Sequence, residues 1–155
     1  MAPASYLSAE KIEELKNELL ELSTTRRKSI AESLDYAKSL GDLSENAEYH
    51  QAREDQAANE DRIRVIDAML RDAVVVTEQH GNTIEVGSSA EVKALQDSRT
   101  FRWTLVGSQE ANVADGKISN ESPMGKAMLG KKKGDAFTFR TPTGINVEYK
   151  VLSVG

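Results

Sequence analysis

The chain has 155 residues, with 20 Lys and Arg, 25 Asp and Glu and a formal net charge of −5. That length suits one domain of moderate size or two small ones, and the acidic balance argues against a protein that coats nucleic acid on its own. Cysteine is absent and only two histidines occur, which excludes disulfides, cysteine nucleophiles and zinc sites built from thiolates or several histidines.

The N-terminus lacks a basic start followed by an apolar run, and no apolar stretch reaches the ~18 residues typical of a membrane span. We therefore expect a cytoplasmic protein that is not bound to a membrane. Charge and glycine content change near residue 72: residues 1–72 hold 10 Lys/Arg against 16 Asp/Glu, and one of the ten glycines. This change predicts two domains, residues 1–75 and 76–155.

Residues 8–40 contain neither glycine nor proline and predict a long helix, which Gly41 is expected to end. Its apolar residues recur every three or four positions, as on the contact face of a coiled coil, at Ile12, Leu15, Leu19 and Leu22. The pattern then becomes less regular, with Arg26 followed by Ile30, Leu34 and Ala37.

After a short break the same spacing resumes at Tyr49, Ala52, Gln56, Asn59, Ile63, Ile66 and Leu70. Two long helices with a short connection predict an antiparallel hairpin, about 45 Å long at ~1.5 Å per residue. Gln56 and Asn59, with Arg26 expected at about their level on the other helix, predict a polar layer that sets the register. A narrow rod of this kind suits insertion into a channel or groove of a partner, and pairing with a second copy is the simpler alternative.

The connection between the helices contains two carboxylates, Asp42 and Glu45, three positions apart at the expected start of the second helix. Two interpretations are open. In the first, Asp42 is the N-cap and Glu45 completes a capping box. In the second, the pair supplies part of a Mg²⁺ shell that is shared with another molecule, because two residues do not complete an octahedron.

The second half has short β-like segments around one short helix, which predicts an antiparallel α+β domain. The helix is expected over Pro123–Leu129, opened by proline and closed by Gly130. The expected strands are Val74–Thr77, Ile84–Val86, Ala90–Leu95, Arg99–Val106, Phe137–Phe139 and Val147–Leu152.

The run Gly41–Glu54, GDLSENAEYHQARE, closely resembles the tip signature of the bacterial Gre transcript cleavage factors, GreA type. The resemblance continues in Gly116–Ser119, Ser122–Lys131 and Thr141–Gly144, and it spans essentially the whole chain. It implies a two-domain α+β fold, with an N-terminal antiparallel coiled-coil hairpin and a C-terminal FKBP-like antiparallel sheet with a short helix.

The resemblance also implies a function: a monomeric accessory factor for transcription elongation, not an autonomous enzyme, that binds backtracked bacterial RNA polymerase. The hairpin of such factors enters the secondary channel of the polymerase. There Asp42 and Glu45 would hold a Mg²⁺ ion shared with the polymerase and orient water for cleavage of the nascent RNA 3′ end. The free protein is not expected to bind this ion.

The resemblance assigns roles to other residues as well, each with a simpler alternative. Arg53 is expected to contact the extruded RNA, or to be an exposed residue without a role. Ser122, Pro123 and Met124 match the region that contacts the polymerase, although Pro123 alone can start the helix and Met124 can simply pack. The alternative functions are a Gre-like antagonist that blocks the same channel without cleavage, a prolyl isomerase activity of the second domain, and a structural dimeriser.

Overall fold

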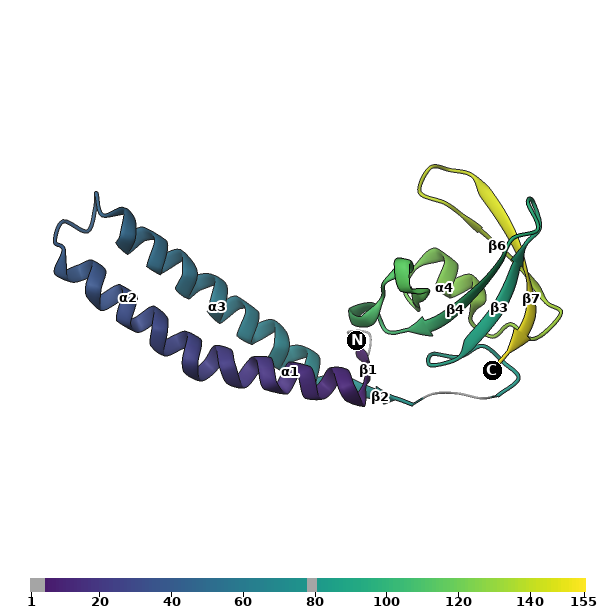
Figure 1. The fold of residues 1–155 in the computed structure, drawn as a ribbon, viewed down its shortest axis with the longest axis horizontal. Helices are drawn as coiled ribbons and strands as arrows, with labels where there is room; N and C mark the ends of the chain where they lie inside the picture. The colour runs from purple at the N-terminus through teal and green to yellow at the C-terminus, as the bar shows by residue number, and fades with distance from the viewer. Residues whose placement is uncertain (1–4, 78–80) are drawn as a thin grey trace. The chain divides into compact units, whose positions relative to one another are not determined.

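A computed structural model describes residues 5–77 and 81–155, and Figure 1 shows its elements. The chain forms two compact units. One is a helical hairpin, Glu10–Asp72, and the other combines strand β1 (Ser5–Ser8) with Ala73–Gly155. The sequence-based division at residues 75 and 76 differs from this one by placing the β1 segment and residues 73–75 with the hairpin. Its residues 1–4 lie outside the described part.

The hairpin has two antiparallel arms joined by a short loop, as predicted (Figure 1). The first arm contains α1 (Ala9–Glu21), a π-helical segment η1 (Leu22–Arg26) and α2 (Arg27–Ser39), and the second is α3 (Ala47–Arg71). The predicted contact face is confirmed at Leu15, Ile30, Leu34, Ala37, Ala52, Ile63 and Ile66, which are buried. At the end of α3 the prediction is wrong by one position, because Met69 is buried and Leu70 is half-buried. None of the described helices is long and apolar enough to cross a bilayer.

The π-helical segment η1 explains the irregular spacing in the first arm. Leu22 is half-buried and Ile30 is buried, although they are eight positions apart, one more than a heptad. A π-helical turn absorbs one additional residue, so both side chains remain on the face towards α3. The side-chain amide of Asn59 donates to the Leu22 carbonyl at 3.0 Å, and Asn59 is itself buried.

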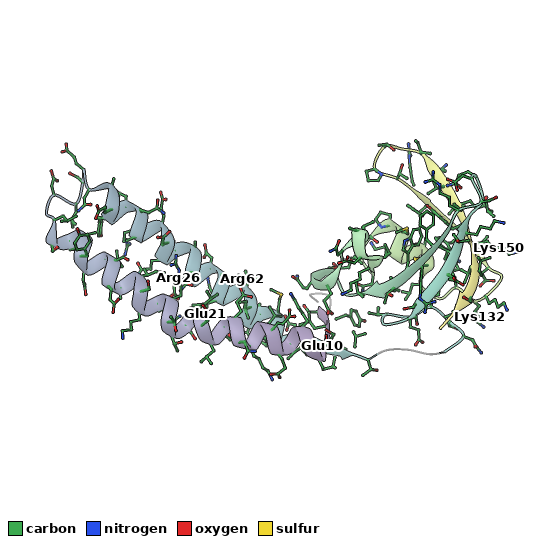
Figure 2. All side chains as sticks on the ribbon, in the orientation of Figure 1. Glu10, Glu21, Arg26, Arg62, Lys132 and Lys150 are labelled. Atoms are coloured by element: carbon green, nitrogen blue, oxygen red, sulfur yellow. The ribbon has the colours of Figure 1, made fainter. Side chains whose placement is uncertain are left out.

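The predicted position of Arg26 in the contact face is wrong. Arg26 is exposed and ends the π-helical segment, at mid-length of the hairpin in Figure 2. The additional residue turns the helix by one position, so the fourth residue after Leu22 no longer faces α3. Of the predicted polar layer, Asn59 is buried and Gln56 is half-buried, whereas Arg26 does not belong to it.

Two bidentate ion pairs join the arms near Asn59. Arg27 binds Glu60 at 2.8 and 2.9 Å, and Arg62 binds Glu18 at 2.7 and 3.0 Å. The hydrogen bond from Arg62 holds the pKa of Glu18 below its usual value of 4.5, and the one from Arg27 does the same for the pKa of Glu60. Since all four side chains are partly exposed, their main effect is on pairing geometry.

The second unit contains, within its described residues, a five-stranded sheet in the order β5-β4-β3-β7-β6 and a parallel pair, β1 with β2. Its helices are the 3₁₀ turns η2 (Ser108–Glu110) and η3 (Val113–Asp115) and helix α4 (Pro123–Met128). The strands are β2 (Ala73–Val76), β3 (Ser89–Ala94), β4 (Thr100–Val106), β5 (Lys117–Ser119), β6 (Ala136–Arg140) and β7 (Asn146–Val154).

The core of this unit lies on one face of the sheet, where Met128 of α4 belongs to one cluster with buried side chains from all five strands, among them Val92, Trp103, Ile118, Phe137 and Val151. The α+β class is confirmed, but the sheet is not purely antiparallel, because β5 pairs with β4 in parallel. The predicted strand at Ile84–Val86 is wrong. Ile84 is fully buried, yet its backbone bonds to the loop after α4, at Lys131 and Gly130, and not to a neighbouring strand.

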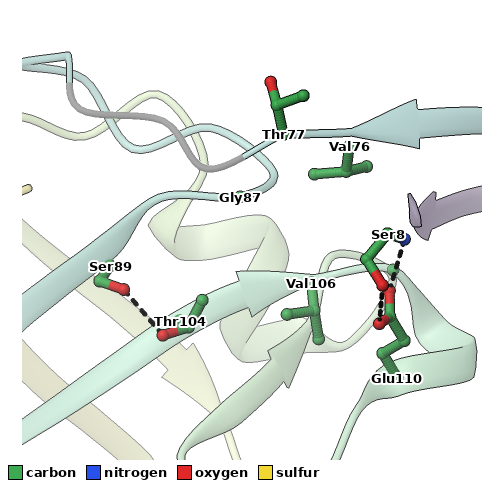
Figure 3. A pocket seen from close by; sticks show the side chains of 9 residues that line it. Ser8, Val76, Thr77, Gly87, Ser89, Thr104, Val106 and Glu110 are labelled. Atoms are coloured by element: carbon green, nitrogen blue, oxygen red, sulfur yellow. Dashed lines mark hydrogen bonds between the residues drawn. The ribbon is translucent and has the colours of Figure 1, made fainter. Parts of the chain in front are cut away.

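Strand β1 was not predicted, and a carboxylate holds its end. The backbone N–H and the hydroxyl of Ser8 both donate to Glu110, at 2.9 and 2.6 Å (Figure 3). Leu7 beside it is fully buried. The four-residue strand is therefore fixed by pairing with β2, by its apolar side chain and by Glu110.

Candidate functional site

The connection between α2 and α3 is an exposed loop with two residues in left-handed backbone conformation. Gly41 has φ of 79° and ends the first arm, as predicted, and Asp42 follows with φ of 38°. Few residues other than glycine adopt positive φ, and Asp and Asn are among those that do so most readily. The chain therefore turns at Gly41 and Asp42, and α3 begins five residues later at Ala47.

Asn46 caps α3. Its side-chain oxygen accepts from the Tyr49 N–H at 3.0 Å, and its amide nitrogen donates to the carbonyls of Ala37 and Gly41, at 2.7 and 3.2 Å. The capping interpretation of Asp42 and Glu45 is wrong, because both precede the cap and lie in the loop. The helix starts later than predicted since Asn46, an equally good cap, is the residue that reaches both helix ends.

The carboxylates of Asp42 and Glu45 are exposed at the end of the hairpin. One Asp42 oxygen accepts from the Ser44 hydroxyl at 3.0 Å, and the Glu45 backbone N–H donates to the Asp42 carbonyl at 3.4 Å. Carboxylate oxygens are the donors that Mg²⁺ prefers, so the pair fits part of such a shell. Within residues 5–77 and 81–155, no group of three or more His, Asp or Glu side chains is arranged to hold a metal.

Residues on the first turns of α3 support the loop. Tyr49 packs with Ile30, Leu34 and Ala52 in a small cluster, as predicted. His50 is exposed, and its Nε2 lies 3.2 Å from the Ser44 carbonyl. Arg53 is exposed on α3 and donates a hydrogen bond to Gln56 at 3.1 Å. This position is compatible with RNA contact and also with an exposed residue that has no role.

The three residues predicted to contact the polymerase begin helix α4. The Ser122 hydroxyl accepts from the Gly125 N–H at 3.0 Å and donates to the Ser119 carbonyl at 2.7 Å, and Pro123 occupies the first turn. Together with Met124 they line a pocket of about 300 Å³. Its walls are almost entirely apolar and also include Ala111, Val113, Ile118, Phe139 and Pro142.

Val113 is one of several residues of this pocket for which the sequence predicted no part in the contact. Its side chain is 72% exposed, the largest exposed fraction among the described large apolar residues. The sequence gives little indication of this role, because a single valine within a polar segment, QEANVADG, is common in loops. Val113 is not isolated, because it adjoins Pro123, Met124 and the other apolar residues of this pocket, and contiguous exposed apolar surface is a feature of protein contact sites.

A second hollow, of about 270 Å³, lies beside β1 in the same unit and is more polar (Figure 3). Ser8, Ser89, Thr104 and Glu110 are among the residues that line it. Ser89 and Thr104 bond to each other at 2.8 Å, and Glu110 binds Ser8. These polar groups are thus engaged in holding strands together.

Family models match both parts of the chain. The model described as "Transcription elongation factor, N-terminal" (GreA_GreB_N) matches residues 5–75, and "Transcription elongation factor, GreA/GreB, C-term" matches residues 78–155. A protein of Alkaliphilus oremlandii named transcription elongation factor GreA is 43% identical over 96% of this chain and 94% of its own. One of the same name from Shouchella clausii is 41% identical over 96% and 95%. Among solved structures, GreA factor homolog 1 of Thermus thermophilus is 28% identical over 99% of both chains, with a TM-score of 0.43.

Proposed function

This chain belongs to the GreA/GreB family of transcription elongation factors, and from that premise we propose that it stimulates RNA cleavage by backtracked bacterial RNA polymerase. It acts in the cytoplasm as an accessory factor whose hairpin enters the secondary channel of the polymerase. The observation that carries this proposal is the pair of exposed carboxylates, Asp42 and Glu45, neither of which caps a helix.

The role of the hairpin follows from its construction. The arm from Ala9 to Ser39 extends the tip by about 45 Å at ~1.5 Å per residue, and the contact face is only one seam wide. Such a rod has little core of its own relative to its length, so it is suited to carrying a loop into a narrow space. The cross-arm ion pairs Arg27–Glu60 and Arg62–Glu18 hold the arms together along the way.

Asp42 and Glu45 contribute oxygen ligands and orient water, and the polymerase and the RNA contribute the remaining ligands. Asp42 and Glu45 would hold part of the shell of a Mg²⁺ ion there, and such an ion would supply Lewis acidity toward the phosphodiester and toward the attacking water. Two exposed carboxylates bind such an ion weakly in the free protein, because Mg²⁺ keeps its hydration shell unless several ligands are offered together. Sharing the ion is consistent with a factor that acts only in the complex.

The apolar pocket beside α4 supports a second contact with the polymerase. We infer that an apolar side chain of the polymerase enters between Met124, Pro123 and Val113, while Ser122 holds the start of α4 in place. Such an anchor would keep the factor bound while the tip engages the active centre. Arg53, exposed on α3, is available to the phosphates of the extruded RNA.

The proposal is tested with stalled, backtracked elongation complexes and Mg²⁺, by measuring release of short 3′ RNA fragments. We expect the wild-type protein to release fragments, and Asp42→Asn and Glu45→Gln to bind polymerase normally but cleave at least about a hundredfold more slowly, as for loss of a transition-state ligand. Asp35→Asn, an identical change at an exposed position of α2, is the matched control and should cleave normally.

Two outcomes would contradict the proposal. Full cleavage by both tip variants would show that the carboxylates have no part in the chemistry. Slowed elongation without any fragment release by the wild-type protein would favour the Gre-like antagonist, which occupies the channel and inhibits.

A further inference from the structure

One side chain holds both ends of the tip loop. The amide nitrogen of Asn46 donates to the carbonyl of Ala37, in the last turn of α2, at 2.7 Å, and to the carbonyl of Gly41 at 3.2 Å. Its oxygen accepts from the N–H of Tyr49 in the first turn of α3 at 3.0 Å. Asn46 thus connects the end of one helix, the loop and the start of the next.

These bonds bracket the two carboxylates. Gly41 directly precedes Asp42, and Asn46 directly follows Glu45. Between these two points the loop is exposed, and its one internal backbone bond among the described residues 42–45, from Glu45 N–H to the Asp42 carbonyl, is long at 3.4 Å. The positive φ of Asp42 also needs support from its surroundings to persist. The other bonds of the loop, from the Ser44 hydroxyl to Asp42 and between His50 and the Ser44 carbonyl, are exposed to solvent. The geometry of the loop therefore depends strongly on how its two ends are fixed.

We propose that Asn46 is a positioning residue, which sets where Asp42 and Glu45 lie relative to each other and to the hairpin axis. The inference rests on the proposed function of the two carboxylates. The Asn46 side chain has two functions, capping α3 and bridging to the first arm and the loop. Capping α3 needs only an oxygen acceptor, which Ser or Asp also provides, whereas bridging to Ala37 and Gly41 needs the amide donor of Asn.

Two variants can remove the amide donor of Asn46 while keeping an oxygen acceptor for the cap. Asn46→Ser keeps an acceptor for the Tyr49 N–H but has no group long enough to reach Ala37 in the other arm. Asn46→Asp keeps the acceptor as well, and replaces the donor with a carboxylate oxygen facing two carbonyls. Asn17→Ser, at an exposed position of α1, is the matched control for the change itself.

Three measurements are made on the full-length variants. Amide hydrogen exchange of residues 41–46 in the free protein reports the order of the loop. The cleavage rate at saturating factor reports the chemistry, and the factor concentration for half-maximal stimulation reports binding. Asp42→Asn is measured in parallel, so that a failure of the proposed function is recognised separately.

We expect both Asn46 variants to fold and to exchange the amides of the loop faster than wild type. We expect their cleavage rate at saturating factor to fall at least about tenfold, while the factor concentration for half-maximal stimulation stays unchanged. A displacement of a catalytic group by ~1 Å commonly has an effect of this size or larger. Cleavage at the wild-type rate by Asn46→Ser, while Asp42→Asn is inactive, would overturn the inference. So would a loss confined to the half-maximal concentration, which indicates a binding defect. If Asp42→Asn also cleaves normally, the proposed function fails. In that case the role of Asn46 is still tested by amide hydrogen exchange, and exchange at residues 41–46 that is unchanged in the Asn46 variants would refute it.

Discussion

Gly125, in the middle of α4, has no room for a side chain. A Cβ built on it would lie 1.9 Å from the Ser119 carbonyl oxygen and 2.8 Å from the carbonyl carbon. That oxygen is held in place by the N–H and the hydroxyl of Ser122, at 3.1 and 2.7 Å. The obstacle is a backbone carbonyl fixed by two hydrogen bonds, so no side-chain movement can relieve the clash. Gly125→Ala must therefore push α4 away from β5.

The size of the effect follows from the distance. Real Cβ atoms essentially never approach another heavy atom closer than 3.0 Å, so the helix must move by at least about 1.1 Å. A shift of this size loosens Met128 in the core, and overpacking by one methyl group typically costs about 1–3 kcal/mol or more. With a urea dependence of about 1–1.5 kcal/mol/M for a unit of this size, a cost of about 3 kcal/mol lowers the unfolding midpoint by about 2–3 M.

Trp103 makes this measurement specific to the second unit. It is the single tryptophan of the chain and lies in the core that includes Met128, so its fluorescence follows unfolding of that unit and not of the hairpin. Gly81→Ala is the matched control, because a Cβ at Gly81 meets nothing within 4 Å. If Gly125→Ala unfolds at the same urea concentration as Gly81→Ala, the packing argument for α4 is incorrect.

Three further outcomes are expected. Asn59→Ala should destabilise the hairpin by about 1–3 kcal/mol in far-UV circular dichroism, because the Leu22 carbonyl loses its partner, and an unchanged midpoint would contradict this. The lowered pKa values of Glu18 and Glu60 stabilise the hairpin at pH above about 4.5, and this contribution is lost as the pH falls through their folded-state values. The double variant Glu18→Gln/Glu60→Gln should therefore show a smaller fall in melting temperature on acidification than wild type. Val113→Asp should weaken polymerase binding without unfolding the second unit, since the side chain is 72% exposed.

The hairpin was largely predictable from sequence, because a face that recurs every three or four residues has one physical solution in a pair of antiparallel helices. The π-helical segment was visible only as an irregularity between Leu22 and Ile30. The spacing of eight positions shows one residue more than a heptad repeat, but several kinds of helix distortion can accommodate one additional residue. The partner that selects this one, Asn59, is 37 positions away.

The tip illustrates a different limit. Asp42, Glu45 and Asn46 lie within five positions, and each is acceptable near a helix start. Local propensity does not decide among them. Asn46 is selected by a donor bond to Ala37, a contact across the hairpin that follows only from the tertiary arrangement. The same holds for β1, whose four residues become a strand through pairing with β2 and bonding to Glu110.

The π-helical segment lets the first arm hold one residue more than its contacts with α3 require. Deleting Thr25 should remove the excess residue where it is accommodated, and convert η1 into regular α-helix with Ile30, Leu34 and the tip left in phase. Deleting Ala31 instead would rotate Leu34 and Ala37 by about 100° out of the contact. Deletion of one residue between Leu22 and Arg26 is thus the change in chain length that this arm accommodates, and it leaves the later contacts with α3 and the position of the tip unchanged.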